Sequence, residues 1–454
     1  VLIVGGGAAG MAAGLELSEN EDLEIIIFDK EKKLGGNSAK ASSGINGVNS
    51  NAQREQGIED SIELFESDII VSGQSLANLK LVHHLAESST SAIEFLESNG
   101  IDLGLLSQCG GHHKPRTHRS RPDPLAKFQK NIGSIITGTL LSKLKEKNNV
   151  KLYSQSEVTK LIKSSSGKVS SIQVNGTLEY NGDAIILASG GYGRDIRLLE
   201  EFRPDYMHLP STNGNWTTGD GVHLARDIGA SLVSMEHVQV HPTGIIDPKN
   251  PTSTSKFLAA EAIRAGGALL INQKGNRFVN ELGLRDQVTK GIFDNCESLP
   301  ESDKQIFSYM ILNEDVIEFF GSKIMSFYQS KGFLIKYESA EEFAKENNIP
   351  FTNLKNTLES YNTAKDNNLV DEFGKDRFPT SYNINEPLYS FMITPSIHYT
   401  MGGVEINQNS EVIDKDGNII SGLYAAGEVS GGLHGKNRLA GNSLLECIVF
   451  GRTA

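Results

Sequence analysis

VLIVGGGAAG, residues 1–10, is the stretch that decides the fold, because an apolar run leads directly into the glycine spacing Gly5-x-Gly7-x-x-Gly10. In such a turn the first glycine permits the tight bend and the second leaves room for a pyrophosphate, while the third lets the next helix pack closely on its strand. We expect a buried strand, a phosphate-binding turn and a helix over residues 8–18 whose first amides face a dinucleotide.

An acidic residue follows this turn at a suitable distance. The apolar strand expected over 23–28 ends at Asp29, near the spacing of about 20 residues at which a carboxylate binds the ribose hydroxyls of a dinucleotide. The glycine spacing alone is weak evidence and often marks only a loop. The order of strand, glycines, helix, strand and acid argues against a simple loop and predicts an α/β, Rossmann-like domain.

Composition limits the possible partners. The chain has 454 residues and a formal net charge of −13, which argues against nucleic acid or an anionic membrane surface as the main partner, because both require a broad basic face. No apolar run approaches the ~18 residues of a membrane span, so we expect a soluble protein. Both ends of the sequence look trimmed, and the compartment is left unpredicted.

The three cysteines exclude several redox centres within this chain. Cys109, Cys296 and Cys447 are widely spaced and form no C-x-x-C pair, so neither a c-type haem attachment nor a four-cysteine iron–sulfur site can be built from them, and a disulfide framework is not expected. Any electron carrier held by this chain is therefore the dinucleotide itself.

Two further glycine turns follow apolar strands. The strand expected over 184–188 runs into Ser189-Gly190-Gly191, and a second strand leads into the glycines of 422–432 before a helix that begins at Asn442. We expect these turns to converge with the first one on a single extended ligand.

The segment 236–398 has a different character, with few glycine turns and with helices expected over 340–347 and 354–366. We interpret it as an inserted α+β capping domain that splits the dinucleotide-binding domain into 1–235 and 399–454. Unusual polar motifs lie at its edges, which predicts that the active cleft lies between the two domains.

Six motifs together are specific. They are GGNSAKASSGIN (35–46), TGDG (218–221), QVHPTG (239–244), NELGLRD (280–286), HYTMGG (398–403) and GEVSGGLHGKNRLAGNS (427–443). In this order they resemble the fumarate reductase and succinate dehydrogenase flavoprotein family, most closely its soluble fumarate reductases. The resemblance implies bound FAD, a mobile capping domain, and transfer of hydride from flavin N5 to fumarate to give succinate.

The resemblance also implies how the proton is delivered. Arg285 corresponds to the family's proton donor, and Glu261 and Arg264 correspond to the groups that resupply it. A guanidinium group normally keeps its proton, so this role requires a strongly basic substrate carbanion beside it and a carboxylate relay behind it. Taken alone, Glu261 and Arg264 would be interpreted as a surface ion pair three residues apart on a helix.

Four residues are expected to bind or orient the substrate. Arg438 can bind a carboxylate through two parallel hydrogen bonds, and the resemblance assigns His398 to the same carboxylate and His241 to the other. Gln239 is expected to orient substrate or flavin. Without the motifs, Arg438 would be interpreted as a surface arginine and His398 as a histidine at a strand end. Many relatives carry Thr where this chain has Ala260, which leaves the second carboxylate with one donor fewer.

The resemblance implies non-covalent FAD, because Asn37 stands where membrane-bound relatives attach FAD through a histidine. The motif 35–46 is expected to surround the isoalloxazine, and the helix beginning near Ser443 is expected to face its N1 and C2 edge. The residues expected to bind the cofactor are Gly5, Gly7, Ala8, Ala9, Gly10, Asp29, Lys30, Gly36, Asn37, Ser38, Ala41, Ser43, Gly44, Val158, Ala188, Ser189, Gly190, Thr218, Asp220, Gly427, Glu428, Ser443 and Leu444.

The densest basic cluster is CGGHHKPRTHRSR (109–121). Its cysteine and histidines suggest zinc, but no standard ligand spacing fits, and we predict no metal site. A basic loop beside an anionic cofactor and a solvated surface loop remain open as explanations.

Other functions remain open as well. The alternatives are an L-aspartate oxidase, a reductase of another unsaturated carboxylate, a flavoprotein subunit of a larger electron-transfer complex, and a protein that only binds flavin. The resemblance suggests free reduced flavin as the electron donor, and we expect a monomer.

Overall fold

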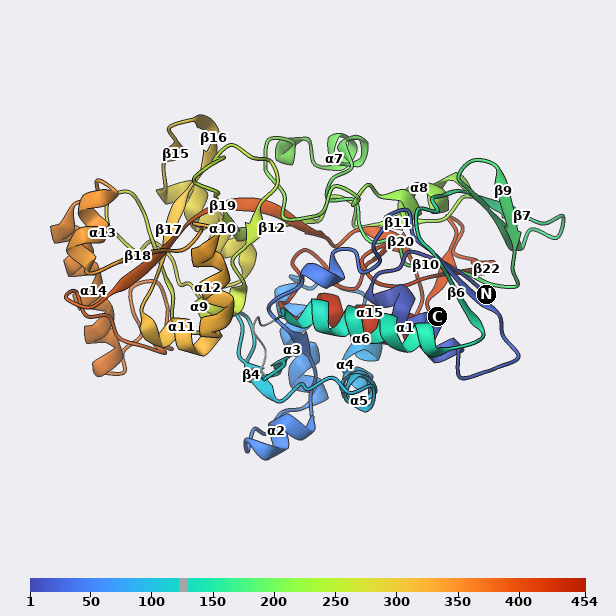
Figure 1. The fold of residues 1–454 in the computed structure, drawn as a ribbon, viewed down its shortest axis with the longest axis horizontal. Helices are drawn as coiled ribbons and strands as arrows, with labels where there is room; N and C mark the ends of the chain where they lie inside the picture. The colour runs from blue at the N-terminus through green and yellow to red at the C-terminus, as the bar shows by residue number, and fades with distance from the viewer. Residues whose placement is uncertain (122–129) are drawn as a thin grey trace.

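The computed structural model describes residues 1–121 and 130–454. Both termini lie in the right-hand part of the molecule in Figure 1, around a six-stranded sheet. The strands of this sheet, in spatial order, are β21 (Glu411–Ile413), β22 (Ile419–Ala425), β10 (Ile185–Leu187), β1 (Leu2–Val4), β2 (Ile25–Phe28) and β6 (Val150–Tyr153). All neighbouring strands run parallel except the edge pair β21 and β22. The predicted α/β class is confirmed.

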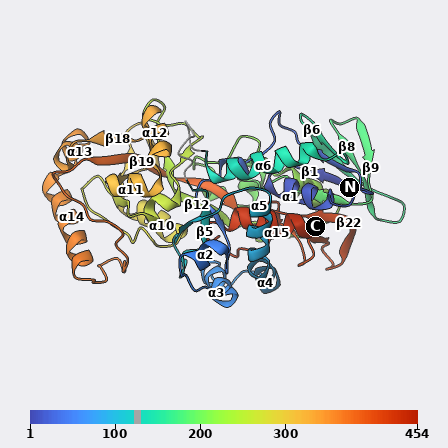
Figure 2. The same cartoon turned by 60° about the horizontal axis from the view of Figure 1, so that its bottom comes forward.

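Three helices form a layer beside this sheet: α1 (Ala8–Leu17), α6 (Ile132–Glu146) and α15 (Asn442–Thr453) (Figures 1 and 2). The first is rich in alanine and glycine, and these small side chains let its backbone approach the strands. A Cβ at Gly10 would lie 2.0 Å from the carbonyl oxygen of Gly5. The predicted helix 8–18 and the predicted strand 23–28 are observed as α1 and β2, and their ends differ from the prediction by at most two residues.

Shorter elements complete this part of the molecule. Its small sheets are β3 (Ile45–Asn46), β5 (Thr117–Arg119) and β4 (Leu105–Ser107); β7 (Val158–Lys163), β8 (Val169–Val174) and β9 (Leu178–Asn181); and β11 (Leu232–Val233), β20 (Gly403–Glu405) and β23 (Ser430–Gly431). Its other helices are α2 (Asn51–Glu55), α3 (Ile62–Ser72), α4 (Leu79–Glu87), α5 (Ser89–Ser98), α7 (Ile196–Phe202) and α8 (Asp220–Asp227).

The serine-rich stretch 88–91 is largely helical, although clustered serines are typical of turns. Helix α5 begins within it, and the hydroxyls of Ser89 and Ser91 donate to the backbone carbonyls three residues before them. Serine can thus satisfy its hydroxyl locally inside a helix.

A second six-stranded sheet fills the left-hand part of Figure 1. Its strands are β13 (Phe257–Leu258), β12 (Val238–Ile245), β19 (Leu388–Thr400), β17 (Ser308–Leu312) and β14 (Leu269–Ile271), with β18 (Ile335–Tyr337) paired to β19. The helices of the same segment are α9 (Glu261–Ala265), α10 (Arg285–Asn295), α11 (Glu314–Phe320), α12 (Ser322–Ser330), α13 (Ala340–Glu346) and α14 (Phe351–Asp366), beside the hairpin of β15 (Ser298–Leu299) and β16 (Ser302–Ile306).

Strands β12 and β19 pair antiparallel and run from this second sheet toward the centre of the molecule (Figure 1). Their register places His241 opposite Ser396 and Gln239 opposite Tyr399, with irregularities after Gln239 and after His241. The chemistry-bearing motifs QVHPTG and HYTMGG therefore lie on neighbouring strands. The expected limits of the capping domain, 236 and 398, remain a prediction.

No helix in the described ranges is long and apolar enough to cross a membrane.

Candidate active site

A cavity of about 520 Å³ extends along the carboxyl ends of β1, β2 and β10 and reaches the second sheet. Its walls come from all three glycine turns, from the motif 35–46, and from the start of α15. Residues of the second sheet and its helices, including Phe257, Phe320 and Tyr328, close the far side. Ligands of doubly wound sheets bind at this edge, so the cavity is the candidate cofactor site.

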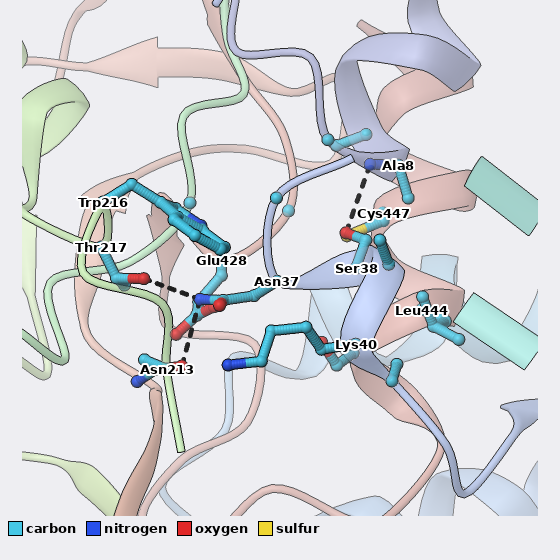
Figure 3. Close-up of a pocket in the computed structure, with 18 of the residues that line it drawn as sticks. Ala8, Asn37, Ser38, Lys40, Asn213, Trp216, Thr217, Glu428, Leu444 and Cys447 are labelled. Atoms are coloured by element: carbon cyan, nitrogen blue, oxygen red, sulfur yellow. Dashed lines mark hydrogen bonds between the residues drawn. The ribbon is translucent and has the colours of Figure 1, made fainter. Parts of the chain in front are cut away.

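The first glycine turn has the geometry that a pyrophosphate requires. Gly5 has a φ of +113°, and a Cβ there would lie 2.3 Å from the carbonyl oxygen of Ala188, so only glycine fits. A Cβ at Gly7 would meet just the Ser38 hydroxyl, at 3.6 Å, which leaves this position open toward the cavity. The Ser38 hydroxyl accepts a hydrogen bond of 3.2 Å from the Ala8 amide (Figure 3). The turn and the first amides of α1 thus form a phosphate cradle.

Asp29 lies at the carboxyl end of β2 beside this cradle. Its carboxylate accepts hydrogen bonds from the backbone amides of Gly6 (2.9 Å) and Glu31 (2.8 Å). Burial raises the pKa of Asp29 and these two amides oppose that rise. The neighbouring Lys30 pairs with Asp220 at 2.6 Å and donates to Thr218. The acid and the TGDG motif therefore form one polar cluster at the cavity wall.

Asn37 is fully engaged by protein groups at the other end of the cavity. Its amide nitrogen donates to Asn213 (3.1 Å) and Thr217 (2.8 Å) (Figure 3). Its oxygen accepts from the Gly214 amide (2.9 Å). The nearby Lys40 donates to the Thr212 carbonyl, and burial lowers the pKa of Lys40 to about 8. Asn37 thus ties the motif 35–46 to the segment that precedes TGDG.

Arg285 and Glu261 form a buried ion pair near the cavity. The Arg285 Nε donates to Glu261 Oε2 at 2.6 Å, and its Nη1 donates to Gln239 Oε1 at 2.6 Å. The other carboxylate oxygen of Glu261 accepts from the Gly110 amide at 3.2 Å, and Arg264 Nη2 lies 3.6 Å from Oε2. Burial alone raises the pKa of Glu261, but Arg285 and Arg264 bring it below its usual value.

His241 presents one free nitrogen. Its Nδ1 accepts from the Thr243 amide at 3.2 Å, while the Thr243 hydroxyl donates to the Ala259 carbonyl. This arrangement assigns the proton to Nε2, which has no hydrogen-bond partner although it is buried. Burial lowers the pKa of His241 well below its usual value, and the Arg285 charge adds to this. The ring is therefore neutral, and its Nε2 lies 3.9 Å from Glu261 Oε2, beyond hydrogen-bond distance.

Arg438 and His398 line the cavity next to this group. His398 Nδ1 bonds the Thr212 hydroxyl at 2.7 Å, and its ring lies edge-on to His241 with centroids 4.9 Å apart. Arg438 makes no ion pair with any residue in the described ranges, and its Nε has no partner. Burial, followed by the Arg285 charge, lowers the pKa of Arg438 well below its usual value. Buried donors without partners indicate an anionic ligand.

The chain matches the model of the FAD binding domain family over residues 1–444. It belongs to this family. Fumarate reductase 1 of Saccharomyces cerevisiae is 39% identical over 471 residues, which cover 100% of this chain and 97% of that protein. The fumarate reductase of Schizosaccharomyces pombe is 37% identical and covers 100% and 88%.

A solved structure gives the same result. The open conformation of a flavocytochrome c3 fumarate reductase superimposes with a TM-score of 0.77 at 33% identity, covering 100% of this chain and 76% of that one. The resemblance found in the motifs is confirmed, and the cofactor of the family, FAD, fits the glycine cradle and Asp29 described above.

Most of the residues expected to bind FAD line the cavity. Two do not. Gly10 is packed under the turn, where it lets α1 approach Gly5, and the Thr218 hydroxyl is used by Lys30 and Asp220. Both residues shape the cavity from behind its wall.

Of the seven residues expected to bind or act on substrate, Arg285, His398 and Arg438 line the cavity directly. Glu261, Arg264 and His241 lie behind them in one buried cluster. The surface interpretations of Arg438 and of the Glu261–Arg264 pair are wrong, because Arg438 is 3% exposed and Arg264 is 1% exposed.

The Gln239 amide is bound by protein groups at both ends. Its oxygen accepts from Arg285, and its nitrogen donates to Asn437 (3.1 Å) and to the Arg438 carbonyl (2.8 Å). Since both ends of the amide bond protein groups, Gln239 fits a bracing role between the two arginines better than contact with substrate or flavin.

The basic cluster 109–121 does not lie beside the cavity, and it is exposed to solvent only in places, such as His113 and Arg121. The segment is largely buried, and none of its residues lines the cavity. Arg116 is held by Asp60 and Asp68, His113 pairs with Asp68, and His112 bonds the Ala440 carbonyl at 3.0 Å. Among the described residues, no group of three or more His, Cys, Asp or Glu side chains is arranged to hold a metal ion.

Several cavity residues were not predicted from the sequence. Lys40, Trp216 and Cys447 line the FAD side, and Phe257, Ile324 and Phe327 line the side of the second sheet. Lys40 stands inside the motif 35–46 and Trp216 stands two residues before TGDG, so proximity to a motif was the available signal. The apolar residues carried no comparable signal.

Proposed function

We propose that this protein reduces fumarate with bound FAD. One observation carries the proposal: Arg285 and Arg438 line the cavity that fits FAD, and behind them lie Glu261, which pairs with Arg285, and the unpartnered Nε2 of His241. An unsaturated dicarboxylate matches this site for two reasons. Its carboxylates bring negative charge to donors that lack an anionic partner, and it brings a carbon–carbon double bond to a buried proton donor.

The chain's own residues bind and polarise the substrate in this proposal. Arg438 and His398 bind one carboxylate, and the Nε2–H of His241 binds the other. Both histidines have pKa values well below the usual range because they are buried, so they donate as neutral rings at pH 7. The donors are fixed before substrate arrives, which favours charge that develops on the carboxylates during reduction.

Proton delivery uses the ion pair. Two Arg285 nitrogens are held by Glu261 and Gln239, and the remaining Nη2 is directed to the substrate. Reduced FAD, when bound, would supply two electrons and one proton as hydride. Arg285 donates the second proton to the adjacent carbon, which converts the double bond to a single bond and yields succinate. Arg264 then passes a proton through the ionised Glu261 carboxylate to Arg285, and a proton from solvent restores Arg264.

FAD is held without a covalent bond in this proposal. The side chain at the position of covalent attachment is Asn37, and both ends of its amide are engaged by protein groups. The α15 amino terminus faces the same region through Ser443 and Leu444, which line the cavity. Partial positive charge at a helix start stabilises the negative charge of reduced flavin.

The segment 236–398 acts as a closing domain over the flavin. The residues Phe257, Phe320 and Tyr328 close the cavity from that side, and exclusion of water by such a cover strengthens the electrostatic interactions inside. We further propose that reduced flavin in solution donates the electrons and that the protein works as a monomer.

An anaerobic assay tests the function. The FAD-loaded protein is reduced with dithionite until no excess remains, and fumarate is added while flavin absorbance is followed. Fumarate should reoxidise the flavin and yield one succinate per FAD, whereas urocanate and acrylate should not. Reoxidation by urocanate or acrylate alone would assign a different unsaturated acid. Oxygen consumption with L-aspartate would indicate an oxidase instead.

A further inference from the structure

Arg438 is held in an unusual way for a buried arginine. Its Nη1 makes a single hydrogen bond of 3.3 Å to the neighbouring Leu439 carbonyl, and its Nε makes none. The guanidinium carbon instead lies 4.3 Å from the centroid of the Tyr399 ring. Since no carboxylate of the described residues pairs with Arg438, the orientation of this cation depends mainly on the position of an aromatic face.

Tyr399 is itself fixed by a residue from another element. Its hydroxyl donates to Glu446 Oε1, and the second oxygen of Glu446 bonds His434 Nε2 at 2.5 Å. The Tyr399 and His434 rings are also in edge contact, with centroids 5.7 Å apart. Tyr399, Glu446 and His434 are exposed by only 3%, 1% and 2%. We name these three residues the Tyr399 brace.

The brace joins a strand, a loop and a helix. Tyr399 lies on β19, Glu446 lies on α15, and His434 lies in the same loop as Arg438. Glu446 therefore fixes both the ring under the guanidinium and the loop from which the guanidinium extends.

Glu446 does not act as a counter-ion of Arg438. The two form no ion pair, and burial raises the pKa of Glu446 well above its usual value. A neutral brace can hold the arginine without neutralising it. The positive charge then remains available to an anionic ligand in the cavity.

We propose that Tyr399, Glu446 and His434 are positioning residues that preorganise Arg438 for a ligand carboxylate. The inference rests on the proposed function, in which Arg438 binds one end of fumarate. Tyr399 lines the cavity beside Arg438, whereas Glu446 and His434 do not. The inference adds that substrate affinity depends on these side chains behind the cavity wall.

The test is a double-mutant cycle on fumarate binding. The dissociation constant of fumarate is measured from the change in flavin absorbance of the oxidised, FAD-loaded protein, for the unmodified chain, Tyr399→Leu, Arg438→Gln and the double variant. Tyr399→Leu should weaken binding about tenfold, because a desolvated cation–π contact is lost. The same substitution should have little further effect when Arg438 is already Gln, because the brace acts through Arg438.

Matched variants separate positioning from general loss of structure. Glu446→Gln should bind fumarate nearly as well as the unmodified chain, since an amide can accept from Tyr399 and donate to His434, whereas Glu446→Leu should resemble Tyr399→Leu. Tyr337→Leu removes a buried tyrosine of the second sheet that is 5% exposed and should leave binding unchanged. If Tyr399→Leu does not retain FAD, Tyr399→Phe replaces it in the cycle, with a smaller loss that also disappears when Arg438 is Gln.

The outcomes distinguish the brace from the function. If Tyr399→Leu loses the same factor in both backgrounds, or loses none in either, the positioning role is overturned while fumarate reduction can stand. If the unmodified chain binds fumarate but does not reduce it, the proposed function fails. If it does not bind fumarate at all, both fail.

Discussion

Removal of the Glu281 carboxylate is expected to destabilise the second sheet and, with it, the support of the active site. Glu281 is completely buried and pairs with Arg277 through two hydrogen bonds of 2.8 and 2.9 Å and with Lys375 at 2.9 Å. Its backbone carbonyl accepts from Arg264. Glu281→Gln keeps the shape of the side chain but leaves Lys375 buried without a carboxylate partner.

The magnitude follows from the pKa of Glu281. Burial raises this pKa, but Lys375 and Arg277 together lower it from 4.5 to about 2. A shift of this size corresponds to roughly 3 kcal/mol of folding free energy at pH 7, and breaking a buried pair costs about 3–5 kcal/mol. Because the pKa is lower in the folded protein, the stabilisation is complete above about pH 4.5 and disappears as the pH falls toward 2.

Urea unfolding followed by circular dichroism measures the effect. Glu281→Gln should lower the free energy of unfolding by roughly 3–5 kcal/mol at pH 7, and its difference from the unmodified chain should shrink between pH 4.5 and pH 2. Glu359→Gln, which breaks an exposed pair with Lys355 at 3.8 Å, is the control and should cost less than about 0.5 kcal/mol. Equal effects of the two substitutions, or a constant difference at all pH values, would refute the reasoning.

Three further predictions concern the cofactor and the reaction. Arg285→Gln should lower the rate of fumarate reduction by about 10²–10⁴-fold in steady-state assays while FAD stays bound. Turnover within tenfold of normal would remove Arg285 from proton delivery. The control is Arg452→Gln, which breaks an exposed ion pair with Glu16. Gly7→Val should fold, because a Cβ there meets no protein atom closer than 3.6 Å, yet lose FAD in equilibrium dialysis, because the side chain points at the phosphates; full FAD content would contradict this. Acid precipitation of the holoprotein should release all flavin into the supernatant, and flavin that stays with the pellet would show a covalent bond.

The sequence was most informative where backbone geometry depends on particular residues. The roles of Gly5 and Gly10 could be predicted from their spacing alone. A Cβ at these positions would lie only 2.3 and 2.0 Å from backbone oxygens, so both positions require glycine. Asp29 followed from its distance to the same turn. The motifs also predicted that Arg285, His241 and Arg438 belong to one group, and the three residues lie close together.

Burial was harder to predict, because it depends on segments that are distant in the chain. The basic composition of 109–121 suggested exposure or contact with an anion, but Arg116 is buried and pairs with Asp60 and Asp68 from another segment. The amide of Gln239 was expected at the ligand, but Asn437 and the Arg438 backbone approach it from the far end of the sequence. No local pattern reports such partners.

Strand β19 links the core of the second sheet to both faces of the reaction centre. Its first half pairs with β17 and β18, and its last residues include His398, next to the cavity, and Tyr399, which reaches α15. Side chains alternate along a strand. A single-residue insertion near Ile393 would therefore exchange the directions of the side chains of His398 and Tyr399. The His398 imidazole would leave the cavity side, and the Tyr399 hydroxyl would lose the Glu446 carboxylate. The number of residues between the first half of β19 and its last residues is thus as constrained as the identities of His398 and Tyr399.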